Sequence, residues 1–497
     1  MSDSGQTGSD SKTGANGLDI DAIMDRAAAA ARAFHELDQN QTDKIVEAVF
    51  RAGFDNRIRL ARAACDETRM GVWKDKVIKN VIATLFVYED IRNMKTVGVI
   101  FEDETKGIVE IAQPVGPIFA ITPVTNPTST VLFKILISLK SRNPIIIRPH
   151  GAARRCSIEA ARICYEAARS AGAPEHCIQW VARSTDQETI ALMSHKKTAM
   201  VLATGSTALV RAAYSSGNPA IGIGPGNVPV FIGKTADIPF AIEQIFLSKT
   251  FDNGTICASE QALVIRGCHV AEAKRLLKER KAYFLSKDEI ARLDKIAFNV
   301  EHRTMRPEVI GQPAPVIARM ADIQVPEDTT LLIAELEEVG LKSPLSLEIL
   351  APILALYVAP NLETAIDLCR KININGGLGH TISMFSNNEE RIRYFASTMN
   401  AGRILVNVPA SQGALGGTYT ALSPSMTLAC GSGGKNHSTD NISAMHLLNI
   451  QRIARRRVSP HISDEAMSMY LDESVTAIDF EKHSRDTLAD DESAPSE

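Results

Sequence analysis

The chain has 497 residues, 45% of them hydrophobic and 23% charged, which fits about two to four globular domains and excludes disorder of the whole chain. Its formal net charge of −4 argues against a dedicated nucleic-acid binder. No apolar run reaches the roughly 18 residues of a membrane span, and the polar start lacks the apolar core of a secretory signal. We therefore expect a cytoplasmic protein with no membrane or nucleic-acid partner.

The chain begins and ends with polar segments that show no periodicity. Residues 1–17 and 473–497 predict disordered tails, the second of them acidic. Between them, residues 18–92 carry apolar side chains at helical spacing, with Asp19 or Asp21 as the first cap. Residues 97–113 predict two strands around a polar turn.

From residue 117 onward, short apolar runs alternate with helical patterns. This alternation predicts βαβ units and buried parallel sheets in two successive α/β lobes. The expected strands are 117–123, 144–149, 177–182, 198–205, 260–265, 352–359, 381–385 and 403–407. The expected helices are 129–139, 152–172, 207–214, 237–250, 269–297, 361–372 and 388–399, and the Gly- and Ser-rich segment 410–436 predicts a loop.

The eight cysteines form no C-x-x-C pair and share no metal-ligand spacing with histidines, so we expect free thiols and no metal site. Three side chains are candidates for catalysis. Cys257 follows the polar turn 252–255, where a thiol is better placed for nucleophilic chemistry than on a helix stripe. Asn126 could donate its amide to an oxyanion, and His380 could act as an acid or base. From pattern alone, each residue also fits a structural role.

The usual glycine-rich phosphate-binding motifs are absent, so sequence patterns leave a nucleotide site open. Residues 204–206 lie where a strand runs into a helix, and could either face a phosphate or form a structural turn. Arg148 ends a strand, and Arg154 and Arg155 follow it. These side chains could meet phosphates at the carboxyl edge of a sheet or lie on a solvated helix face.

Four stretches carry a more specific pattern: PVTNPTSTVLFKILISLKSRN (123–143), AAYSSGNPAIGIGPGNVPV (212–230), SKTFDNGTICASEQ (248–261), and GGLGHT (376–381) with NVPASQGALGG (407–417). Together they resemble the CoA-acylating branch of the aldehyde dehydrogenase family. That branch includes the aldehyde dehydrogenase half of aldehyde-alcohol dehydrogenases and acylating sulfoacetaldehyde dehydrogenases.

The resemblance spans about residues 18–457 and implies an α/β aldehyde dehydrogenase fold with three parts. These are a Rossmann-like cofactor lobe (18–96 and 114–236), an α/β catalytic lobe (237–428) and a small β oligomerisation flap (97–113 and 429–457). The flap implies a homodimer or homotetramer.

The resemblance also implies a mechanism. The Cys257 thiolate attacks an aldehyde, while the Asn126 amide and the Cys257 N–H stabilise the oxyanion. Hydride leaves to NAD or NADP, and coenzyme A, with His380 assisting its deprotonation, releases the acyl group from a cysteine thioester. Hydrolytic relatives carry a water-activating glutamate at the position of Ile223. Its absence favours CoA transfer over the alternative, a hydrolytic aldehyde or semialdehyde dehydrogenase that gives a free acid. A non-catalytic protein on the same fold would require an inert Cys257.

The resemblance assigns cofactor contacts to Thr122, Pro123, Arg148, His150, Thr204, Gly205, Ser206, Gly224 and Glu348. Glu348 matches the residue that holds the nicotinamide ribose. The glutamate that would bind the other ribose and repel a 2′-phosphate is absent, so NADP fits as well as NAD. Lys435 stands in a C-terminal segment, 431–436, where relatives carry tryptophan. If that segment borders the pocket, an anionic substrate such as sulfoacetaldehyde fits as well as acetaldehyde.

Overall fold

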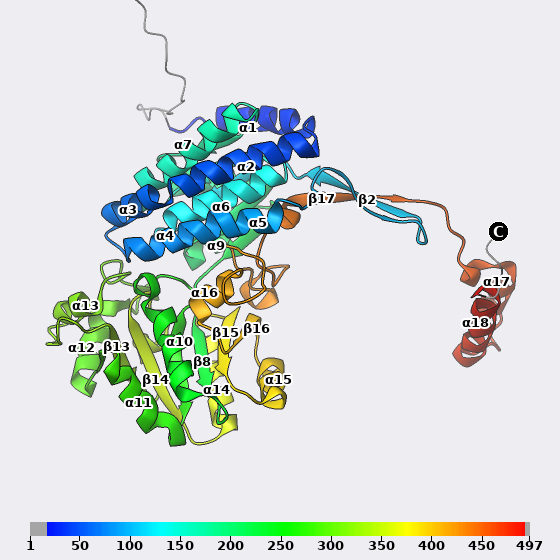
Figure 1. The fold of residues 1–497 in the computed structure, drawn as a ribbon. Helices are drawn as coiled ribbons and strands as arrows, with labels where there is room; N and C mark the ends of the chain where they lie inside the picture. The colour runs from blue at the N-terminus through cyan, green and yellow to red at the C-terminus, as the bar shows by residue number, and fades with distance from the viewer. Residues whose placement is uncertain (1–16, 493–497) are drawn as a thin grey trace, which may run out of the picture. The chain divides into compact units, whose positions relative to one another are not determined.

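The computed structural model describes residues 17–492 (Figure 1). The predicted tail over 1–17 therefore lies outside the described residues, apart from Gly17. Contacts divide the described chain into a larger unit, 17–96 with 113–449, and a smaller unit, 97–112 with 450–492. Among residues 17–492, no helix combines the length and the apolar character that crossing a bilayer requires.

The N-terminal segment is helical, as its periodicity predicts. Asp19 caps the first helix, because its side chain accepts a hydrogen bond from Ala22 N at 3.0 Å. The helices are α1 (Ile20–His35), α2 (Gln39–Asp55), α3 (Arg57–Thr68), α4 (Trp73–Val81), the π-helical turn η1 (Ile82–Phe86) and α5 (Val87–Ile91).

The first sheet of the larger unit has five parallel strands in the order β5-β4-β3-β6-β7. Its strands are β3 (Ile118–Ile121), β4 (Ile145–Arg148), β5 (Ile178–Trp180), β6 (Met200–Thr204) and β7 (Ala220–Ile223). The helices between and after them are α6 (Pro127–Lys140), α7 (Arg154–Ser170), α8 (Asp186–Ser194) and α9 (Thr207–Tyr214).

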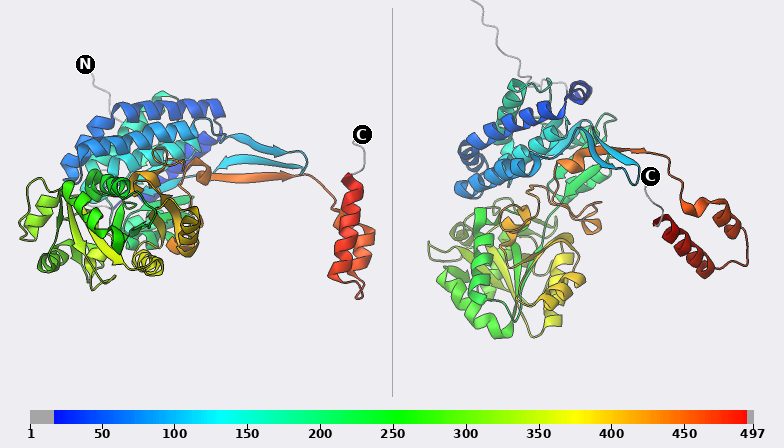
Figure 2. Two further views of the ribbon diagram at one scale, coloured as in Figure 1. Left: turned by 60° about the horizontal axis from the view of Figure 1, so that its bottom comes forward. Right: turned by 45° about the vertical axis from the view of Figure 1, so that its right-hand side comes forward.

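Alternate residues of β3 enter different cores. Ile118 and Ala120 pack with side chains of α2, α6 and α7, whereas Phe119 and Ile121 pack with those of α1, α8 and α9. Both faces of the sheet are therefore covered by helices, which explains the continuous apolar strands. In Figures 1 and 2, α2, α6 and α7 lie side by side, and each of them contacts the other two.

The second sheet has seven parallel strands in the order β10-β13-β14-β9-β8-β15-β16. They are β8 (Val228–Ile232), β9 (Glu260–Arg266), β10 (Ala282–Phe284), β13 (Leu331–Glu335), β14 (Ile353–Ala359), β15 (Gly379–Phe385) and β16 (Ala401–Val406). The α-helices of this lobe are α10 (Ile238–Thr250), α11 (Val270–Glu279), α12 (Lys287–Ala297), α13 (Ala314–Met320), α14 (Leu362–Ile374), α15 (Glu389–Thr398) and α16 (Ala410–Leu415).

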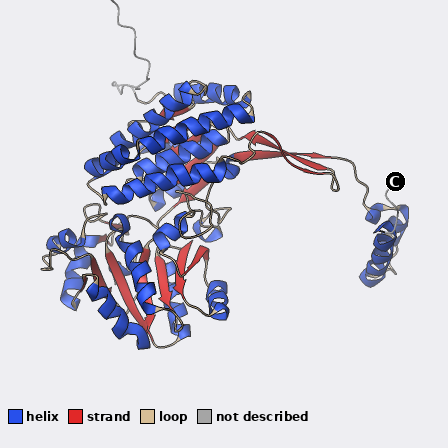
Figure 3. Cartoon of the chain, in the orientation of Figure 1, coloured by secondary structure: helices blue, strands red, loops and turns tan. Residues whose placement is uncertain are grey.

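This sheet is also covered on both faces, and Figure 3 shows its strands between helices. Val230 and Ile232 of β8 pack with α10 and α11, whereas Phe231 packs with α14 and α15. The remaining pieces are a two-strand hairpin, β11 (Phe298–Asn299) with β12 (Thr304–Met305), and the 3₁₀ turns η2 (Gly151–Ala153), η3 (Phe251–Gly254), η4 (Gly267–His269), η5 (Pro344–Ser346), η6 (Ser432–Gly434) and η7 (Ala444–Leu447).

The smaller unit contains a three-stranded sheet in the order β1-β2-β17. β1 (Gly98–Asp103) and β2 (Ile108–Pro114) form the predicted antiparallel hairpin, and β17 (Leu448–Ala454) is added from the C-terminal segment. Beyond β17 the chain forms η8 (Pro460–Ile462), α17 (Asp464–Tyr470) and α18 (Ala477–Glu492).

The structure differs from the sequence predictions in several places, one of which is helix α16 at the start of the predicted loop 410–436. The predicted helix over 269–297 is two helices, α11 and α12, separated by β10. Residues 477–492 form α18 where a disordered tail is predicted. The first sheet gives way to the second between β7 and β8, before the predicted lobe boundary at 236. By contacts, residues 429–449 belong to the larger unit and not to the predicted flap.

Candidate active site

The carboxyl edge of the five-stranded sheet gathers most of the predicted cofactor residues. Ile121, the last residue of β3, pairs with Arg148 of β4 and with Ala203 of β6. Thr122 and Thr204 consequently follow adjacent strand positions. The strand order reverses between β3 and β6, and open α/β sheets bind ligands at such a switch point. Pro123, His150, Gly205, Ser206 and Gly224 also follow the strand ends at this edge.

Several of these side chains have partners at the edge. Arg148 Nε donates to Ser184 Oγ at 3.3 Å, and His150 Nδ1 accepts from Ala152 N at 3.2 Å. Ser206 caps α9. Thr122 is buried, yet its Oγ1 has no hydrogen-bond partner among the described residues. A buried hydroxyl without a partner is costly, so this edge fits a ligand that supplies a polar group there.

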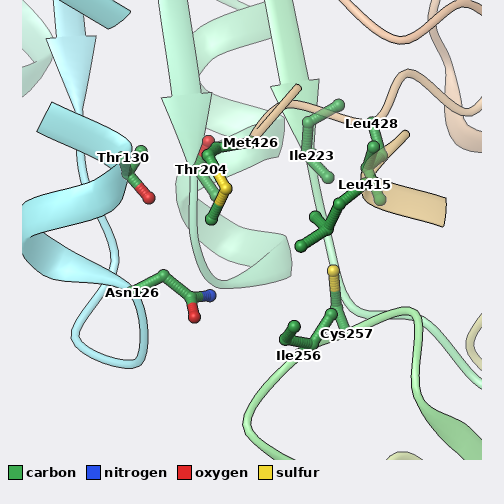
Figure 4. Close-up of a pocket in the computed structure, with 9 residues that line it drawn as sticks. All are labelled: Asn126, Thr130, Thr204, Ile223, Ile256, Cys257, Leu415, Met426 and Leu428. Carbon is green, nitrogen blue, oxygen red and sulfur yellow. The ribbon is translucent and has the colours of Figure 1, made fainter. Parts of the chain in front are cut away.

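A cavity brings Cys257, Asn126 and Thr204 together (Figure 4). Its other lining residues are Thr130, Ile223, Ile256, Leu415, Met426 and Leu428. Thus the predicted nucleophile and the predicted oxyanion donor face one space, together with one predicted cofactor residue. No charged side chain is among these nine lining residues.

A left-handed turn places Cys257 at this cavity. Asp252, Asn253 and Gly254 have φ values of 49°, 53° and 71°. At Gly254 a Cβ would lie 2.7 Å from the Ala351 carbonyl oxygen, so only glycine fits there. In Figure 4 the Cys257 sulfur points into the group of lining side chains. The turn therefore aims the thiol at the cavity just before β9 begins.

The surroundings of Cys257 favour the neutral thiol. Burial and the negative charge of Glu348 raise the pKa of Cys257 to about 12, although the positive charge of Arg403 opposes the rise. Only the thiolate is a strong nucleophile. Attack from this thiol therefore requires that its proton leave as the new bond forms.

His380 does not line the cavity. Its ring packs on Gly226, where a Cβ would lie 2.4 Å from the Cys257 carbonyl oxygen and 3.2 Å from the ring. The imidazole is 1% exposed, its Nδ1 lies 3.0 Å from Thr381 Oγ1, and its Nε2 has no partner among the described residues. Burial and the charge of Arg403 lower the pKa of His380 to about 3. The role of His380 in deprotonating coenzyme A stays a prediction.

Glu348 contacts Gly226, the same residue on which the His380 ring packs. Its Oε1 accepts a hydrogen bond from Gly226 N at 2.8 Å, and burial raises its pKa to about 7. The carboxylate is thus close enough to Cys257 to affect the thiol, but it is not part of the cavity wall. Its predicted contact with the nicotinamide ribose stays a prediction.

Lys435 also does not line the cavity. Residues that precede it in the chain line the cavity instead, namely Leu415, Met426 and Leu428. Asn436, next to Lys435, donates to the Gly222 carbonyl at 3.0 Å and so ties the loop to the end of β7. The anionic substrate stays a prediction.

Sequence reasoning missed two buried lysines of α4. Lys76 and Lys79 are at most 3% exposed, and both form ion pairs with Asp252, which is fully buried. Lys79 also donates to Asn126 Oδ1 at 2.6 Å. The only signal in the sequence is two lysines three residues apart on an amphipathic helix, which normally indicates an exposed face. Their burial depends on an aspartate more than 170 residues away.

Comparison with known proteins identifies the family. Residues 8–289 match the description "Aldehyde dehydrogenase family". The chain belongs to the aldehyde dehydrogenase family. The fold of this chain is similar to that of a solved acetylating aldehyde dehydrogenase from Geobacillus thermoglucosidasius. That structure is 44% identical, with a TM-score of 0.86, and the match covers 89% of this chain and 97% of that one.

Two curated members of the aldehyde dehydrogenase family illustrate the range of relatives. Aldehyde-alcohol dehydrogenase 2 of Entamoeba histolytica is 44% identical over 85% of this chain and 49% of its own length. Succinate-semialdehyde dehydrogenase (acetylating) of Clostridium kluyveri is 32% identical over 88% of this chain and 96% of its own. The chain thus spans about half the length of the aldehyde-alcohol dehydrogenases it matches.

Proposed function

We propose that this protein oxidises a short aldehyde to its acyl-CoA, using NAD or NADP and coenzyme A through a thioester on Cys257. The observation that carries this proposal is the cavity wall beside the thiol. Ile223 lines the cavity and is 3% exposed, and by the sequence resemblance it matches the position where hydrolytic relatives carry the water-activating glutamate. Without a base to activate water, a thioester persists until a stronger nucleophile such as a thiol attacks it. Relatives described as acetylating agree with this choice.

The residues of the cavity then have distinct roles. Cys257 Sγ forms a bond to the aldehyde carbon as its proton passes to water, and the carbonyl oxygen gains negative charge. The Asn126 Nδ2–H and the Cys257 backbone N–H donate to that oxygen. A nicotinamide cofactor held at the carboxyl edge of the five-stranded sheet would supply the acceptor for the hydride of the hemithioacetal. The thiolate of coenzyme A then attacks the thioester and frees the Cys257 sulfur.

The lining of the cavity favours an uncharged aldehyde. The side chains around Asn126 and Cys257 are mainly aliphatic, and no cation lies among the nine that could pair with a sulfonate or carboxylate. Burying an unpaired anion there would be unfavourable. We therefore favour acetaldehyde or a similar short aldehyde over sulfoacetaldehyde.

The cofactor residues support a dinucleotide but leave both nicotinamide forms open. Arg148 offers a positive charge at the carboxyl edge, which suits a 2′-phosphate. Glu67, however, accepts hydrogen bonds from Arg155 N and Cys156 N at 2.8 and 2.7 Å, so a carboxylate already occupies the start of α7. Relative kcat/KM values for the two cofactors, measured in the wild type and in Arg148→Ala, decide whether the enzyme prefers NAD or NADP.

The small β sheet supports assembly into a homodimer or homotetramer. Val99 and Phe101 of the edge strand β1 are 49% and 52% exposed. An exposed apolar edge strand is a surface that a second copy can cover. Light scattering after size-exclusion chromatography measures the assembly directly.

The test of the proposed function is NAD(P)H formation from acetaldehyde and from sulfoacetaldehyde, with and without coenzyme A, in the wild type and in Cys257→Ala. We expect CoA-dependent turnover of acetaldehyde that the variant lacks. Equal turnover without coenzyme A would instead establish the hydrolytic reaction. A higher kcat/KM for sulfoacetaldehyde would refute the substrate assignment.

A further inference from the structure

One buried ammonium connects the two catalytic groups of the cavity. Lys79, on α4, has a side chain that is only 1% exposed. Its Nζ donates to Asn126 Oδ1 at 2.6 Å, to Thr255 Oγ1 at 2.9 Å, and to Asp252 Oδ2. Asn126 lies in the loop after β3, whereas Asp252 and Thr255 form the turn before Cys257. Lys79 is thus hydrogen-bonded to both of the segments that carry the chemistry.

The hydrogen-bond donors of Lys79 determine how the Asn126 amide is turned. An ammonium can only donate, so the amide oxygen must face it and the amide nitrogen must face away. Asn126 Nδ2 donates one of its two hydrogens to Thr125 Oγ1, at 3.2 Å. Its second hydrogen has no hydrogen-bond partner within residues 17–492. In Figure 4 the nitrogen lies on the side of the amide towards Cys257.

The opposite orientation would prevent catalysis. If the carboxamide rotated by half a turn, its oxygen would face the position where negative charge develops on the substrate, and it would repel that charge. The amide oxygen and nitrogen are nearly equal in size, so packing alone selects weakly between the two orientations. A donor-only partner on one side selects strongly.

We propose that Lys79 is a positioning residue, which holds the Asn126 carboxamide with its N–H towards the oxygen of the hemithioacetal on Cys257. The turn before Cys257 does not depend on Lys79 alone, because Val72 N and Lys76 Nζ also donate to Asp252, at 2.7 and 2.9 Å. The inference rests on the proposed function, because it assumes that an oxyanion forms at Cys257.

The groups around Lys79 keep it charged for this role. Burial lowers the pKa of Lys79 to about 8, and the negative charge of Asp252 opposes that decrease. The other charged groups that affect it are Lys76, which disfavours the ammonium, and Asp75, which favours it. Asp252 therefore supports the orientation of Asn126 indirectly, by stabilising the ammonium that donates to it.

The experiment is a double-mutant cycle between Lys79 and Asn126, with kcat and KM measured for the CoA-dependent reaction. Loss of one oxyanion donor typically costs about 10²–10³ in kcat, so we expect Lys79→Met to lower kcat by about 10- to 100-fold with little change in KM. In the Asn126→Ala background the same substitution should lower kcat less than about threefold, because groups that act as a unit are not additive. Lys79→Gln, whose amide can donate to Asn126 Oδ1, should retain more activity than Lys79→Met.

Lys140→Met is the matched control for the loss of a buried ammonium. Lys140 is fully buried and pairs with Asp43 and the Arg92 carbonyl, none of which lines the cavity. We expect this variant to lose stability without losing kcat. If Lys79→Met does not fold, Lys79→Ala, which also lacks a donor, takes its place in the cycle and in the comparison with Lys79→Gln.

The outcomes separate the inference from the proposed function. Equal losses from the Lys79 substitution in the Asn126 and Asn126→Ala backgrounds would overturn the positioning role. So would equal activity of Lys79→Gln and Lys79→Met. If Asn126→Ala itself is as active as the wild type, or if turnover does not need coenzyme A, the proposed function has failed.

Discussion

Lys76 Nζ lies 2.9 Å from Asp252 Oδ2, and neither side chain is more than 3% exposed. Asp252 Oδ1 accepts a further hydrogen bond from Val72 N at 2.7 Å, and Oδ2 accepts one from Thr255 Oγ1 at 2.7 Å. A buried carboxylate is tolerated only when it is paired and hydrogen-bonded, and Asp252 has both kinds of partner. The same contacts hold α4 against the turn that carries the nucleophile.

We expect Asp252→Asn to lower the free energy of unfolding by about 3–5 kcal/mol, because it leaves two buried ammonium groups without a counter-charge. Chemical denaturation measures the loss. Asp43→Asn is the control, since Asp43 also pairs with a buried lysine but is itself 36% exposed. A loss no larger than that of the control would mean that the buried pairing contributes little.

The same carboxylate predicts a pH dependence of stability. Burial alone would raise the pKa of Asp252, but the charges of Lys79 and Lys76 and the hydrogen bonds from Lys79 and Thr255 lower it overall. A depressed pKa in the folded state stabilises the protein above the unfolded value, about 3.9, and this stabilisation is lost as the pH falls through the folded value. Wild type should therefore lose more stability than Asp252→Asn between pH 5 and the acid limit, which thermal melts over that range can measure.

Ile223→Glu should convert part of the activity to hydrolysis. The new carboxylate would line the cavity beside Cys257 and could activate water against the thioester. We expect NAD(P)H formation without coenzyme A to rise by about tenfold or more. Ile223→Gln has the same shape without the base and should stay CoA-dependent. Equal CoA-independent rates in the two variants would show that added space, rather than a base, admits water.

Alkylation of Cys257 should become faster over an unusually wide pH range. Because burial raises the pKa of Cys257 to about 12, the thiolate fraction should rise about tenfold per pH unit between pH 7 and 10. Iodoacetamide labelling of this cysteine, followed by peptide mass spectrometry, gives the rate, and Cys257→Ser gives the background. A plateau below pH 8 would contradict the expected environment of the thiol.

His380→Gln should separate the two halves of the reaction. If His380 assists coenzyme A, the variant should still form about one NAD(P)H per site in a first burst, while the later steady-state rate falls. Because the pKa of His380 is lowered to about 3, the imidazole is neutral throughout pH 5–9 and should contribute no step to the kcat profile there. Loss of the burst as well would place His380 in the first half-reaction.

Local patterns were sufficient for most elements near the site. Helix α9 occupies the predicted residues 207–214, and β6 lies within the predicted strand 198–205. The break in 269–297 was missed because apolar periodicity does not report it: Lys281 adopts a φ of 67°, and β10 pairs with β13 about fifty residues away. The local signal was the capping box of Ser286 and Glu289, which marks the start of α12.

The site residues also divide into those that local motifs reveal and those that only tertiary contacts place. Cys257 and Asn126 could be singled out because their motifs are local, and the structure brings both to one cavity. Lys79 could not, because a lysine on a helix is normally solvated and its burial follows from tertiary contacts with Asp252 and Asn126. The burial of His380 likewise depends on Gly226 and Arg403, which lie in other segments.

The apolar wall at Ile223 also has a thermodynamic consequence. In the proposed reaction, an intermediate protected from water keeps the energy released by aldehyde oxidation in an activated bond, whereas hydrolysis would dissipate it as heat. The overall free-energy change of the oxidation is then small, so the reverse reaction is also accessible. If the proposed function holds, the aliphatic side chain beside the thiol lets the reaction run in either direction, as the concentrations of its reactants dictate, whereas a water-activating base there would make it effectively irreversible.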